Sequence, residues 1–462
     1  MATQALVLIP TTQRGQLLPP HLFAPIVGLP YLQRLIFSLW RAGISRVGLL
    51  APPAARAQLE KRLARMKGPA GATLEVFSRW QDLPLPAPSN TENGSILVMA
   101  ADILTTPAVL AEFSRSPVPE GGLALAVADC RAGAQPPGIQ AAMRVSMEEN
   151  LITSFDFATG SGSHCVLGLA LFSQSAWRGW RSWLQNQGLA EVPDAAPNAA
   201  LFPYFVEQAR GNRLMGIETE AGAVASIQND QDVKNAAFRL VMATHGSPWG
   251  EGCLESSVNR RLARYILLRL ADKAILVHPN CITVADLLLG LVAVAGFLVG
   301  NYWAGLGAAL LLPWIIVLDT LDGLLARLTF QESPEGRLLD LYGDTILNLL
   351  IFCGIAVGRY RATGQALFIL LLIPLTFGYA WCWRLTNPLQ ERRRQTSGGL
   401  SPLSKKEFAS GPEKMLNEAV SRDYFYLILL CALFSVLDWF IIATAIGINL
   451  FGLFLSRRRR PD

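Results

Sequence analysis

The chain has 462 residues, of which 51% are hydrophobic and only 16% are charged, and its formal net charge is +5. A single core stops growing at roughly 250–300 residues, so this length predicts two domains. The charged fraction is low for a soluble protein, and long apolar runs are concentrated after residue 281. The composition therefore excludes an ordinary soluble chain and predicts a membrane-embedded second half.

The cysteines give no sign of a metal site or of a disulfide framework. The chain has 7 of them, scattered without a C-x-x-C pair. We therefore expect buried, reduced thiols. They are Cys130, Cys165, Cys253, Cys281, Cys353, Cys382 and Cys431. The opening sequence, MATQALVLIPTTQRG, has too short an apolar stretch for a signal peptide, so we expect the first domain on the cytoplasmic side.

Residues 1–245 alternate short apolar runs with helical stretches. This alternation predicts an α/β, doubly wound domain with a mostly parallel sheet. The expected strands are Ala5–Pro10, Val47–Ala51, Thr73–Ser78, Ser95–Ala100 and Gly122–Ala128. The expected helices are Pro30–Ala42 and Ala54–Met66.

Residues 246–281 are expected to link the two domains. The segment Asn259–Val277 (NRRLARYILLRLADKAILV) places arginines among Leu, Ile and Tyr. Such a pattern is typical of a helix that lies in the membrane interface with its basic face toward anionic lipid.

Residues 282–456 predict an all-α domain of six transmembrane helices. Several apolar stretches are shorter than the ideal 20 residues, and the last two are separated only by Asp438 and Trp439, so one long span there is an open alternative. The expected spans are Ile282–Gly300, Ala304–Leu318, Leu338–Gly358, Ala366–Trp383, Tyr424–Leu437 and Phe440–Leu455.

The basic residues indicate the orientation of these spans. Arginines cluster at Arg392–Arg394 and at Arg457–Arg460, and six spans would place both clusters on the same side as the first domain. The opposite loops then hold only Arg359 and Arg361, as the positive-inside rule requires. This pattern favours a multi-pass protein of the inner membrane with both termini cytoplasmic. Nucleic-acid binding is the alternative reading of such clusters, and we expect no nucleic-acid partner.

Four aspartates stand where the second expected span ends and the third begins, in DTLDGLLARLTFQESPEGRLLDLYGD. Asp319 and Asp322 are three residues apart and Asp340 and Asp344 are four apart, so each pair shares one face of a helix. Carboxylates at the ends of membrane spans are costly unless something neutralises them. Hard divalent cations such as Mg²⁺ are the expected partners, together with substrate phosphates. Arg327 is placed to meet a phosphate.

This stretch resembles the CDP-alcohol phosphotransferase (CDP-alcohol phosphatidyltransferase) family. It fits the pattern D-x2-D-G-x2-A-R-x8-G-x3-D-x3-D at every fixed position, from Asp319 to Asp344. The resemblance covers residues 255–462 and includes His278–Leu288 (HPNCITVADLL), which is similar to the P-N-x-I-T start of the family's first span.

The resemblance implies a transferase of phospholipid biosynthesis that moves a phosphoalcohol group from a CDP-alcohol to an alcohol acceptor and releases CMP. It implies Mg²⁺ or Mn²⁺, as two ions, held by Asp319, Asp322, Asp340 and Asp344. Asp344 would also be the general base for the acceptor hydroxyl. The implied CDP-alcohol contacts are Gly323, Ala326, Arg327, Ser333, Gly336, Asn280 and Thr283. The implied partners are a CDP-alcohol such as CDP-diacylglycerol, the acceptor, membrane lipid and a second copy of the chain.

The first domain resembles sugar-nucleotide and inositol-phosphate nucleotidyltransferases, but it departs from them where their chemistry lies. His21 and Leu29 occupy two lysine positions, and Gln228 stands where a second acidic residue is expected, whereas Asp102 matches a metal-binding aspartate. We therefore expect a degenerate, inactive domain. An active cytidylyltransferase is the alternative, and Arg14 and Gly15 favour it. The domain order is similar to that of inositol-phosphate cytidylyltransferase/di-inositol-phosphate phosphate synthase enzymes.

The acceptor stays open at this stage, with inositol phosphate and glycerol phosphate both as candidates. Four arginine positions could face an acceptor phosphate: Arg359, Arg384, Arg422 and the Arg392–Arg394 cluster. A non-catalytic, membrane-anchored binding protein is the hypothesis from another class. The complete set of four aspartates favours the enzyme.

Overall fold

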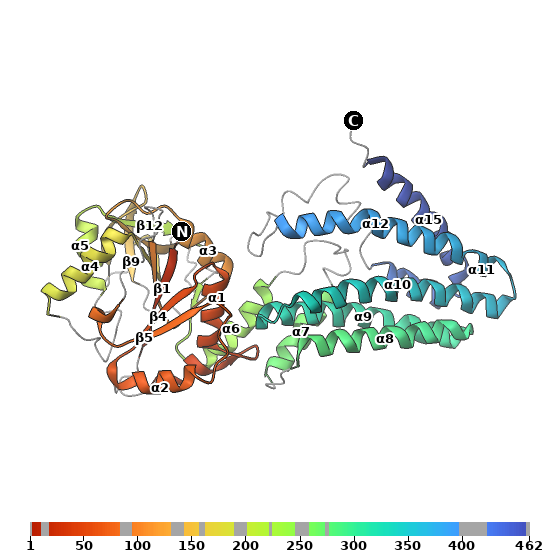
Figure 1. Cartoon of the computed structure of the whole chain (residues 1–462), viewed down its shortest axis with the longest axis horizontal. Helices are drawn as coiled ribbons and strands as arrows, with labels where there is room; N and C mark the ends of the chain where they lie inside the picture. Colours follow the sequence, from red (N-terminus) through yellow and green to blue (C-terminus); the bar gives the residue numbers. More distant parts are fainter. Residues whose placement is uncertain are drawn as a thin grey trace. The chain divides into compact units, whose positions relative to one another are not determined.

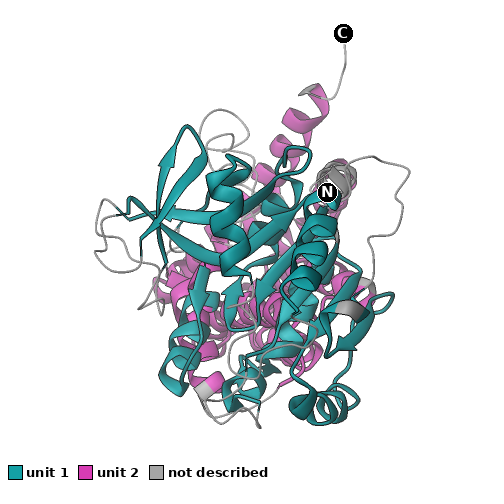
Figure 2. Cartoon of the chain, turned by 90° about the vertical axis from the view of Figure 1, so that its left-hand side faces the viewer, with its two compact units in different colours: residues 1–240 teal, residues 241–462 magenta. Residues whose placement is uncertain are grey.

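The computed structural model describes residues 2–10, 18–83, 95–130, 143–156, 162–188, 201–220, 224–244, 258–272, 277–396 and 423–458. The chain forms two compact units, residues 1–240 and 241–462 (Figures 1 and 2). The sequence predicts three parts, with boundaries at residues 245 and 281. That finer division stays a prediction.

The first unit is built on a nine-stranded mixed sheet in the order β5-β4-β1-β6-β11-β8-β12-β10-β9. Strands β5, β4, β1 and β6 run parallel to one another, and β11 is antiparallel to both of its neighbours β6 and β8. The strands of this sheet are β1 (Ala2–Leu8), β4 (Arg46–Leu50), β5 (Thr73–Phe77), β6 (Ser95–Ala100), β8 (Leu123–Asp129), β9 (Arg144–Glu148), β10 (Leu151–Asp156), β11 (His164–Phe172) and β12 (Leu214–Glu218).

Two small sheets and a set of helices complete the first unit. Strand β7 (Ile103–Thr105) pairs with β13 (Val224–Ser226), and β2 (Pro25–Ile26) pairs with β3 (Leu29–Pro30). The helices are α1 (Tyr31–Arg41), α2 (Pro53–Leu63), α3 (Pro107–Arg115), α4 (Gln174–Asn186), α5 (Phe202–Arg210) and α6 (Asp230–Ala243), with short 3-10 turns η1 (Pro20–Phe23) and η2 (Trp80–Asp82).

The centre of the sheet is buried on both faces. All six residues of β6 are buried, although successive side chains of a strand point to opposite faces. On one face, Ile96 and Val98 pack with Trp177 and Trp180 of α4. This packing explains why the central strands are continuous apolar runs rather than alternating ones.

The predicted elements of the first unit lie within a few residues of observed ones, and Ser95–Ala100 matches β6 at both ends. The prediction of a mostly parallel sheet holds for β5, β4, β1 and β6, whereas the other half of the sheet is mixed. Strands β9 to β12 have no predicted counterpart. The α/β class is observed, and the doubly wound arrangement stays a prediction.

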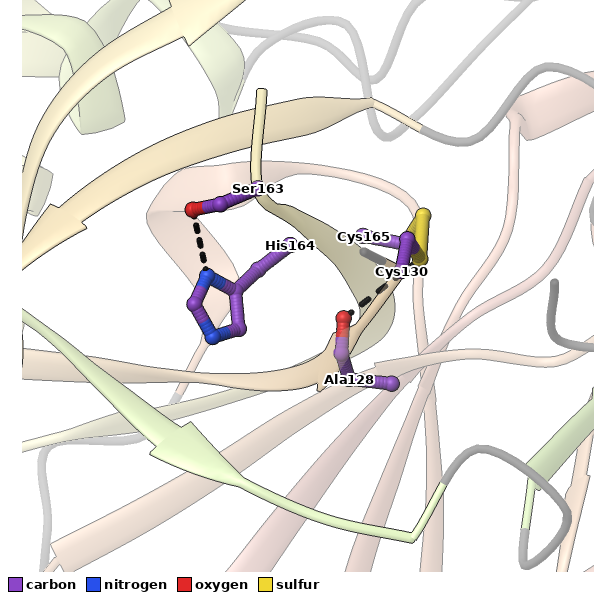
Figure 3. Close-up of a disulfide and its surroundings, with 5 residues drawn as sticks. All are labelled: Ala128, Cys130, Ser163, His164 and Cys165. Atoms are coloured by element: carbon purple, nitrogen blue, oxygen red, sulfur yellow. Dashed lines mark hydrogen bonds between the residues drawn. A yellow bond between two sulfur atoms is a disulfide. The ribbon is translucent and has the colours of Figure 1, made fainter. Parts of the chain in front are cut away.

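One cysteine prediction is wrong. Cys130 and Cys165 form a disulfide, with their Cα atoms 6.2 Å apart (Figure 3). The pair was not visible in the sequence because 35 residues separate the two cysteines, and only the pairing of β8 with β11 brings them together. The other cysteines of the described segments, Cys281, Cys353, Cys382 and Cys431, are free as expected, but Cys281 is exposed and the other three are only partly buried. Cys253 lies outside the described residues.

The second unit is helical. It consists of α7 (Arg260–Asp272), α8 (Pro279–Val299), α9 (Tyr302–Thr329), α10 (Pro334–Thr363), α11 (Leu367–Leu370), α12 (Leu372–Thr396), α14 (Tyr424–Leu433) and α15 (Leu437–Arg458). Within the described residues, five helical segments are long and apolar enough to cross a membrane, in α8, α9, α10, α11–α12 and α15. The fifth predicted span, Tyr424–Leu437, contains the short helix α14 instead, so the six-span count stays a prediction.

The last two apolar stretches are separate helices. Helix α14 ends at Leu433, and Ser435 adopts a positive φ of 58°, which breaks the helical path before α15 begins. One continuous span across both stretches is therefore excluded. The predicted interfacial segment Asn259–Val277 contains α7, whose Ala263 and Leu267 are buried while Tyr265 is exposed.

Helices α8, α9 and α10 pack side by side (Figure 1). Glycines bring α8 and α10 into close contact along their length. A Cβ atom at Gly354 would lie 3.2 Å from the carbonyl oxygen of Val294, and one at Gly358 would overlap the carbonyl group of Phe297. Small residues at such positions let the backbones of membrane helices approach closely. The two helices start at the same end of the bundle, so residues near their first turns are neighbours.

Candidate functional site

Helix α9 continues through the acidic motif rather than ending before it. It spans 28 residues and ends at Phe330, which adopts a left-handed conformation with φ 56°. The backbone N–H of Gln331 donates to the carbonyl of Ala326 and closes the helix end. Asp319 and Asp322 therefore lie one turn apart in the last part of a continuous helix, as their spacing predicts.

Helix α10 begins directly after the motif's central loop. Ser333 is its N-cap, and the Ser333 hydroxyl accepts a hydrogen bond from the backbone N–H of Gly336 at 2.9 Å. Pro334 follows in the first turn, where a missing N–H costs nothing. This start places Asp340 and Asp344 in the second and third turns of α10. The Ser333 hydroxyl thus has a structural partner, and its predicted contact with the CDP group stays a prediction.

The four motif aspartates converge, and a fifth aspartate joins them. Carboxylate oxygens of Asp319, Asp322 and Asp340 lie within 4.8 Å of one another. A second group, of Asp286, Asp319 and Asp344, meets the same distance limit. Asp319 belongs to both groups, so α8, α9 and α10 together form one acidic centre. We call the end of the bundle that holds these residues the acidic end.

The donor set fits a hard divalent cation. All five candidate ligands are carboxylates, and Asp286 and Asp322 are only 2% and 7% exposed. Buried carboxylates at such close range repel one another unless a cation or proton lies between them. Mg²⁺ and Mn²⁺ prefer oxygen donors of this kind, and there is no sulfur or imidazole ligand in either group.

Thr283 holds one of these carboxylates in place. Its hydroxyl donates a hydrogen bond to Oδ2 of Asp322 at 2.6 Å, and both side chains are buried. The sequence analysis placed Thr283 near the nucleotide, a role that stays a prediction. The structure shows a different contact: Thr283 orients a candidate metal ligand, as the groups behind metal ligands commonly do.

The remaining motif residues lie around the acidic centre. The Arg327 guanidinium folds back toward Gly323, where a Cβ atom would lie 3.3 Å from one of its terminal nitrogens. A Cβ atom at Gly336 would lie 2.9 Å from the Ser333 hydroxyl and 3.3 Å from the Asn280 side-chain oxygen. Gly323 and Gly336 are therefore positions where a larger side chain would crowd polar groups. Ala326, one turn after Asp322, is half-buried.

Arg359, one of the arginines proposed for an acceptor phosphate, lies away from this centre. Arg359 donates hydrogen bonds to both carboxylate oxygens of Asp438, with Arg359 Nη2 2.7 Å from Oδ2. Because α10 rises about 1.5 Å per residue, Arg359 lies about 22 Å along the helix from Asp344. Arg384 is exposed on α12. Arg422 and the side chains of Arg392–Arg394 lie outside the described residues.

The first unit has a smaller polar cluster around Asp102. The Ser226 hydroxyl donates to Asp102 at 3.1 Å, and the Gln228 amide donates to Ser226 at 3.3 Å. Burial raises the pKa of the Asp102 carboxyl, and the hydrogen bond from Ser226 opposes that rise. Gln228 thus places a neutral amide where the resemblance expects a second acid.

His21 lies near the same cluster. Burial lowers the pKa of its imidazole, and the negative charges of Asp102, Asp230 and Asp232 raise it by less. A neutral imidazole therefore occupies the position of a lysine. Asp232 accepts backbone hydrogen bonds from Gln228 and Asn229 at the start of α6, which gives it a capping role. Arg14 and Gly15 lie outside the described residues. No group of three converging acidic, histidine or cysteine ligands occurs in the described part of this unit.

Asp286 is the site residue that the sequence analysis missed. It stands 33 positions before Asp319, outside the motif. A signal was nevertheless present, because Asp286 is the only charged residue of α8 and an ionisable residue inside a membrane span is by default a functional candidate.

Comparison with known proteins identifies the class of this centre. The CDP-alcohol phosphatidyltransferase family model matches residues 276–397, which contain all five aspartates. The second unit therefore carries a CDP-alcohol phosphatidyltransferase domain.

Two particular proteins are similar to this chain. One is the bifunctional IPC transferase and DIPP synthase of Archaeoglobus fulgidus, which is 27% identical over 143 residues. That match spans 31% of this chain and 27% of the relative's length. The other is a solved structure, the inositol-1-phosphate CTP transferase from T. maritima, with 15% identity and a TM-score of 0.37. The match covers 53% of this chain and 98% of the T. maritima protein.

Proposed function

We propose that the second unit transfers a phosphoalcohol group from a CDP-alcohol to the hydroxyl of an alcohol acceptor and releases CMP. The observation that carries this proposal is the convergence of Asp319, Asp322, Asp340 and Asp344 within a matched CDP-alcohol phosphatidyltransferase domain. Transfer of a substituted phosphate group needs positive charge at the diphosphate and a base for the attacking hydroxyl. The carboxylates of the acidic centre can hold cations that supply the positive charge, and one carboxylate can act as the base.

Asp344 is the proposed general base. It takes the proton of the acceptor hydroxyl while the hydroxyl oxygen bonds to the phosphorus that carries the donor alcohol. The bond between that phosphorus and the bridging oxygen breaks, and CMP leaves with the bridging oxygen and the bonding electron pair. Arg327 donates charge-assisted hydrogen bonds to a phosphate oxygen. The aspartates would hold Mg²⁺ or Mn²⁺, as two ions, and the bound cations would supply positive charge at the diphosphate and at the leaving CMP.

The proposed substrates follow from the membrane setting. The predicted spans present large exposed apolar side chains, among them Leu288, Val292 and Leu310. A donor with acyl chains can reach the acidic end from the bilayer, so we propose CDP-diacylglycerol as the donor. Inositol phosphate and glycerol phosphate are the proposed acceptors, and the product is then a phospholipid.

Turnover by the purified protein tests this function. The full chain in lipid nanodiscs is given CDP-diacylglycerol, Mg²⁺ and each acceptor in turn, and CMP and lipid products are measured. We expect acceptor-dependent CMP release that EDTA stops and Mg²⁺ or Mn²⁺ restores. Absence of CMP release with every donor and acceptor pair would favour the non-catalytic binding protein instead.

We further propose that the acidic end faces the cytoplasm, as the arginine distribution predicts. Cysteines introduced at Glu335, near the acidic end, and at Thr363, at the opposite end of α10, test the orientation in a variant without native free cysteines. An impermeant thiol reagent added outside intact cells should label Thr363→Cys and leave Glu335→Cys unlabelled. The reverse pattern would contradict the orientation.

A bifunctional enzyme is the second candidate, because the Archaeoglobus relative carries a bifunctional name. In that case the first unit would make the CDP-alcohol from CTP. The Asp102–Ser226–Gln228 network, which holds a single acidic residue, and the neutral His21 favour an inactive first unit instead. Pyrophosphate release from the full chain with CTP, Mg²⁺ and inositol phosphate decides between them. We expect none above background, and steady release that Asp102→Asn abolishes would restore the bifunctional candidate.

A further inference from the structure

Asp286 occupies an unusual position for an acidic side chain. It is the only charged residue of the 21-residue helix α8, and it is 2% exposed. A carboxylate within a membrane span costs several kcal/mol unless it is paired or holds a cation, and such residues mark functional sites. Leu, Ala or Gly would serve packing better at this point, as they do in the rest of α8.

The geometry around Asp286 indicates what it serves. Its carboxylate oxygen lies within 4.8 Å of oxygens of Asp319 and Asp344, so three helices each contribute one ligand to this group. The other group, of Asp319, Asp322 and Asp340, draws on α9 and α10 alone. Two groups that share one carboxylate match the arrangement of two-metal sites, in which neighbouring ions lie about 3.5–4 Å apart.

The charge of the centre also favours two ions. Five carboxylates carry five negative charges, and Arg327 contributes one positive charge beside them. One divalent ion would leave a net charge of minus two in a largely buried site, whereas two ions would leave the site neutral. Without Asp286, the second group would offer only Asp319 and Asp344, one carboxylate from α9 and one from α10.

We propose that Asp286 is a metal ligand of this chain and completes a second divalent cation site with Asp319 and Asp344. The proposal rests on the proposed function, since it assigns a residue to the metal centre of that reaction. A carboxylate has two oxygens, so Asp344 can bind the second ion through one and receive the acceptor proton on the other.

Helix α8 then serves both ion sites from one face. Thr283 holds Asp322 of the first group through its hydroxyl, and Asp286 lies one helical turn later and belongs to the second group. Residues three apart on a helix share a face, so this pair can act toward a single centre. The first span is therefore part of the catalytic site rather than only a membrane anchor.

Counting bound Mn²⁺ tests the proposal without using turnover. The purified full chain is titrated with Mn²⁺, and free Mn²⁺ is followed by electron paramagnetic resonance. We expect two tight ions for the wild type and one for Asp286→Asn, whose second ion binds at least ~100-fold more weakly. Glu335→Gln removes an exposed carboxylate near the same end of α10 and is the matched control. It should keep both ions.

Asp286→Leu provides a second variant in case the amide perturbs the helix. It replaces the buried carboxylate by an apolar side chain, so the metal-free protein should unfold at the same or a higher temperature and still bind one Mn²⁺. Two tight ions in either Asp286 variant would overturn the proposal, and loss of both ions from a folded variant would contradict a separate second site.

The wild-type protein shows whether only the assignment of Asp286 fails or the proposed function fails as well. If it releases CMP while an Asp286 variant keeps both ions, only the assignment of Asp286 fails. If it neither binds Mn²⁺ nor releases CMP, the proposed function fails with it.

Discussion

Each unit contains an aspartate that accepts a hydrogen bond from a hydroxyl, and the two have different surroundings. In the first unit, Ser226 donates to Asp102 at 3.1 Å, and in the second, Thr283 donates to Asp322 at 2.6 Å. Asp322 has further carboxylates within 4.8 Å on two helices, whereas Asp102 is joined through Ser226 to the neutral Gln228.

This comparison shows that one matching aspartate does not make a metal site. A divalent cation needs several oxygen ligands, which must come from elements that the fold brings together. The second unit meets this requirement with three packed helices. In the described part of the first unit, the half-buried Asp102 has the neutral groups of Ser226 and Gln228 in its network, and desolvation raises its pKa.

The largest effect is expected from the second unit's ligands. Asp322→Asn and Asp344→Asn should each lower CMP release by at least ~10³-fold, because each removes a metal ligand or the base. Both variants should remain folded in the membrane, since each loses a negative charge from a crowded acidic centre. Metal-dependent CMP release at a near wild-type rate by either variant would contradict the role assigned to that aspartate. The control variant Glu335→Gln should retain full activity.

A smaller effect is expected from the hydroxyl behind the ligand. Thr283→Val keeps the shape of the side chain but removes the hydrogen bond to Asp322, so CMP release and Mn²⁺ affinity should each fall by about 10- to 100-fold. Thr283→Ser keeps a hydroxyl and should recover most of both. If Thr283→Val lowers CMP release at unchanged Mn²⁺ affinity, Thr283 acts on the nucleotide, as the sequence resemblance implies, and not through Asp322.

The smallest effect is expected in the first unit. Asp102→Asn should leave CMP release unchanged and raise the unfolding temperature of the first unit by roughly 1–3 °C at pH 7. The sign follows from the raised pKa of Asp102: its contribution to stability is complete below the ordinary value of 3.8 and is lost as the pH rises through the folded-state value. Asparagine can still accept from Ser226 without carrying a charge.

Differential scanning calorimetry at pH 7 and at pH 4 measures this change. The gain from Asp102→Asn should be larger at pH 7, where the carboxylate is ionised. A lower unfolding temperature at pH 7 would show instead that the charge of Asp102 is compensated, as it would be in a working metal site.

The convergence of the four motif aspartates could be predicted from the sequence because they lie in one short stretch. Asp319 to Asp344 spans a helix end, a capped turn and a helix start, and the spacing within each helix fixes which face the carboxylates share. Asp286 was not predicted because it lies on another helix, and only the packing of α8 against α9 and α10 brings it to the acidic centre.

The same limit applies to the first unit. Several of its strands are recognisable in the sequence as short apolar runs, so the predicted strands lie near β1, β4, β5, β6 and β8. Strand β11 pairs with strands that are distant in the sequence, such as β8. The Cys130–Cys165 disulfide depends on this pairing. No local pattern of residues encodes such a pairing.

The glycine contact between α8 and α10 has a mechanical consequence for the acidic end. The backbones of Gly300 and Gly358 are in close contact. Gly300 lies 14 residues after Asp286, and Gly358 lies 14 residues after Asp344, which is about 21 Å along either helix. With this contact as a fixed point, the two helices would act as lever arms of equal length. A change of about 5° in their crossing angle would separate the carboxylates by about 2 Å, as much as a whole Mg–O bond. A bulky side chain at Gly358 would thus weaken cation binding at the far end of the bundle, although every ligand would still be present.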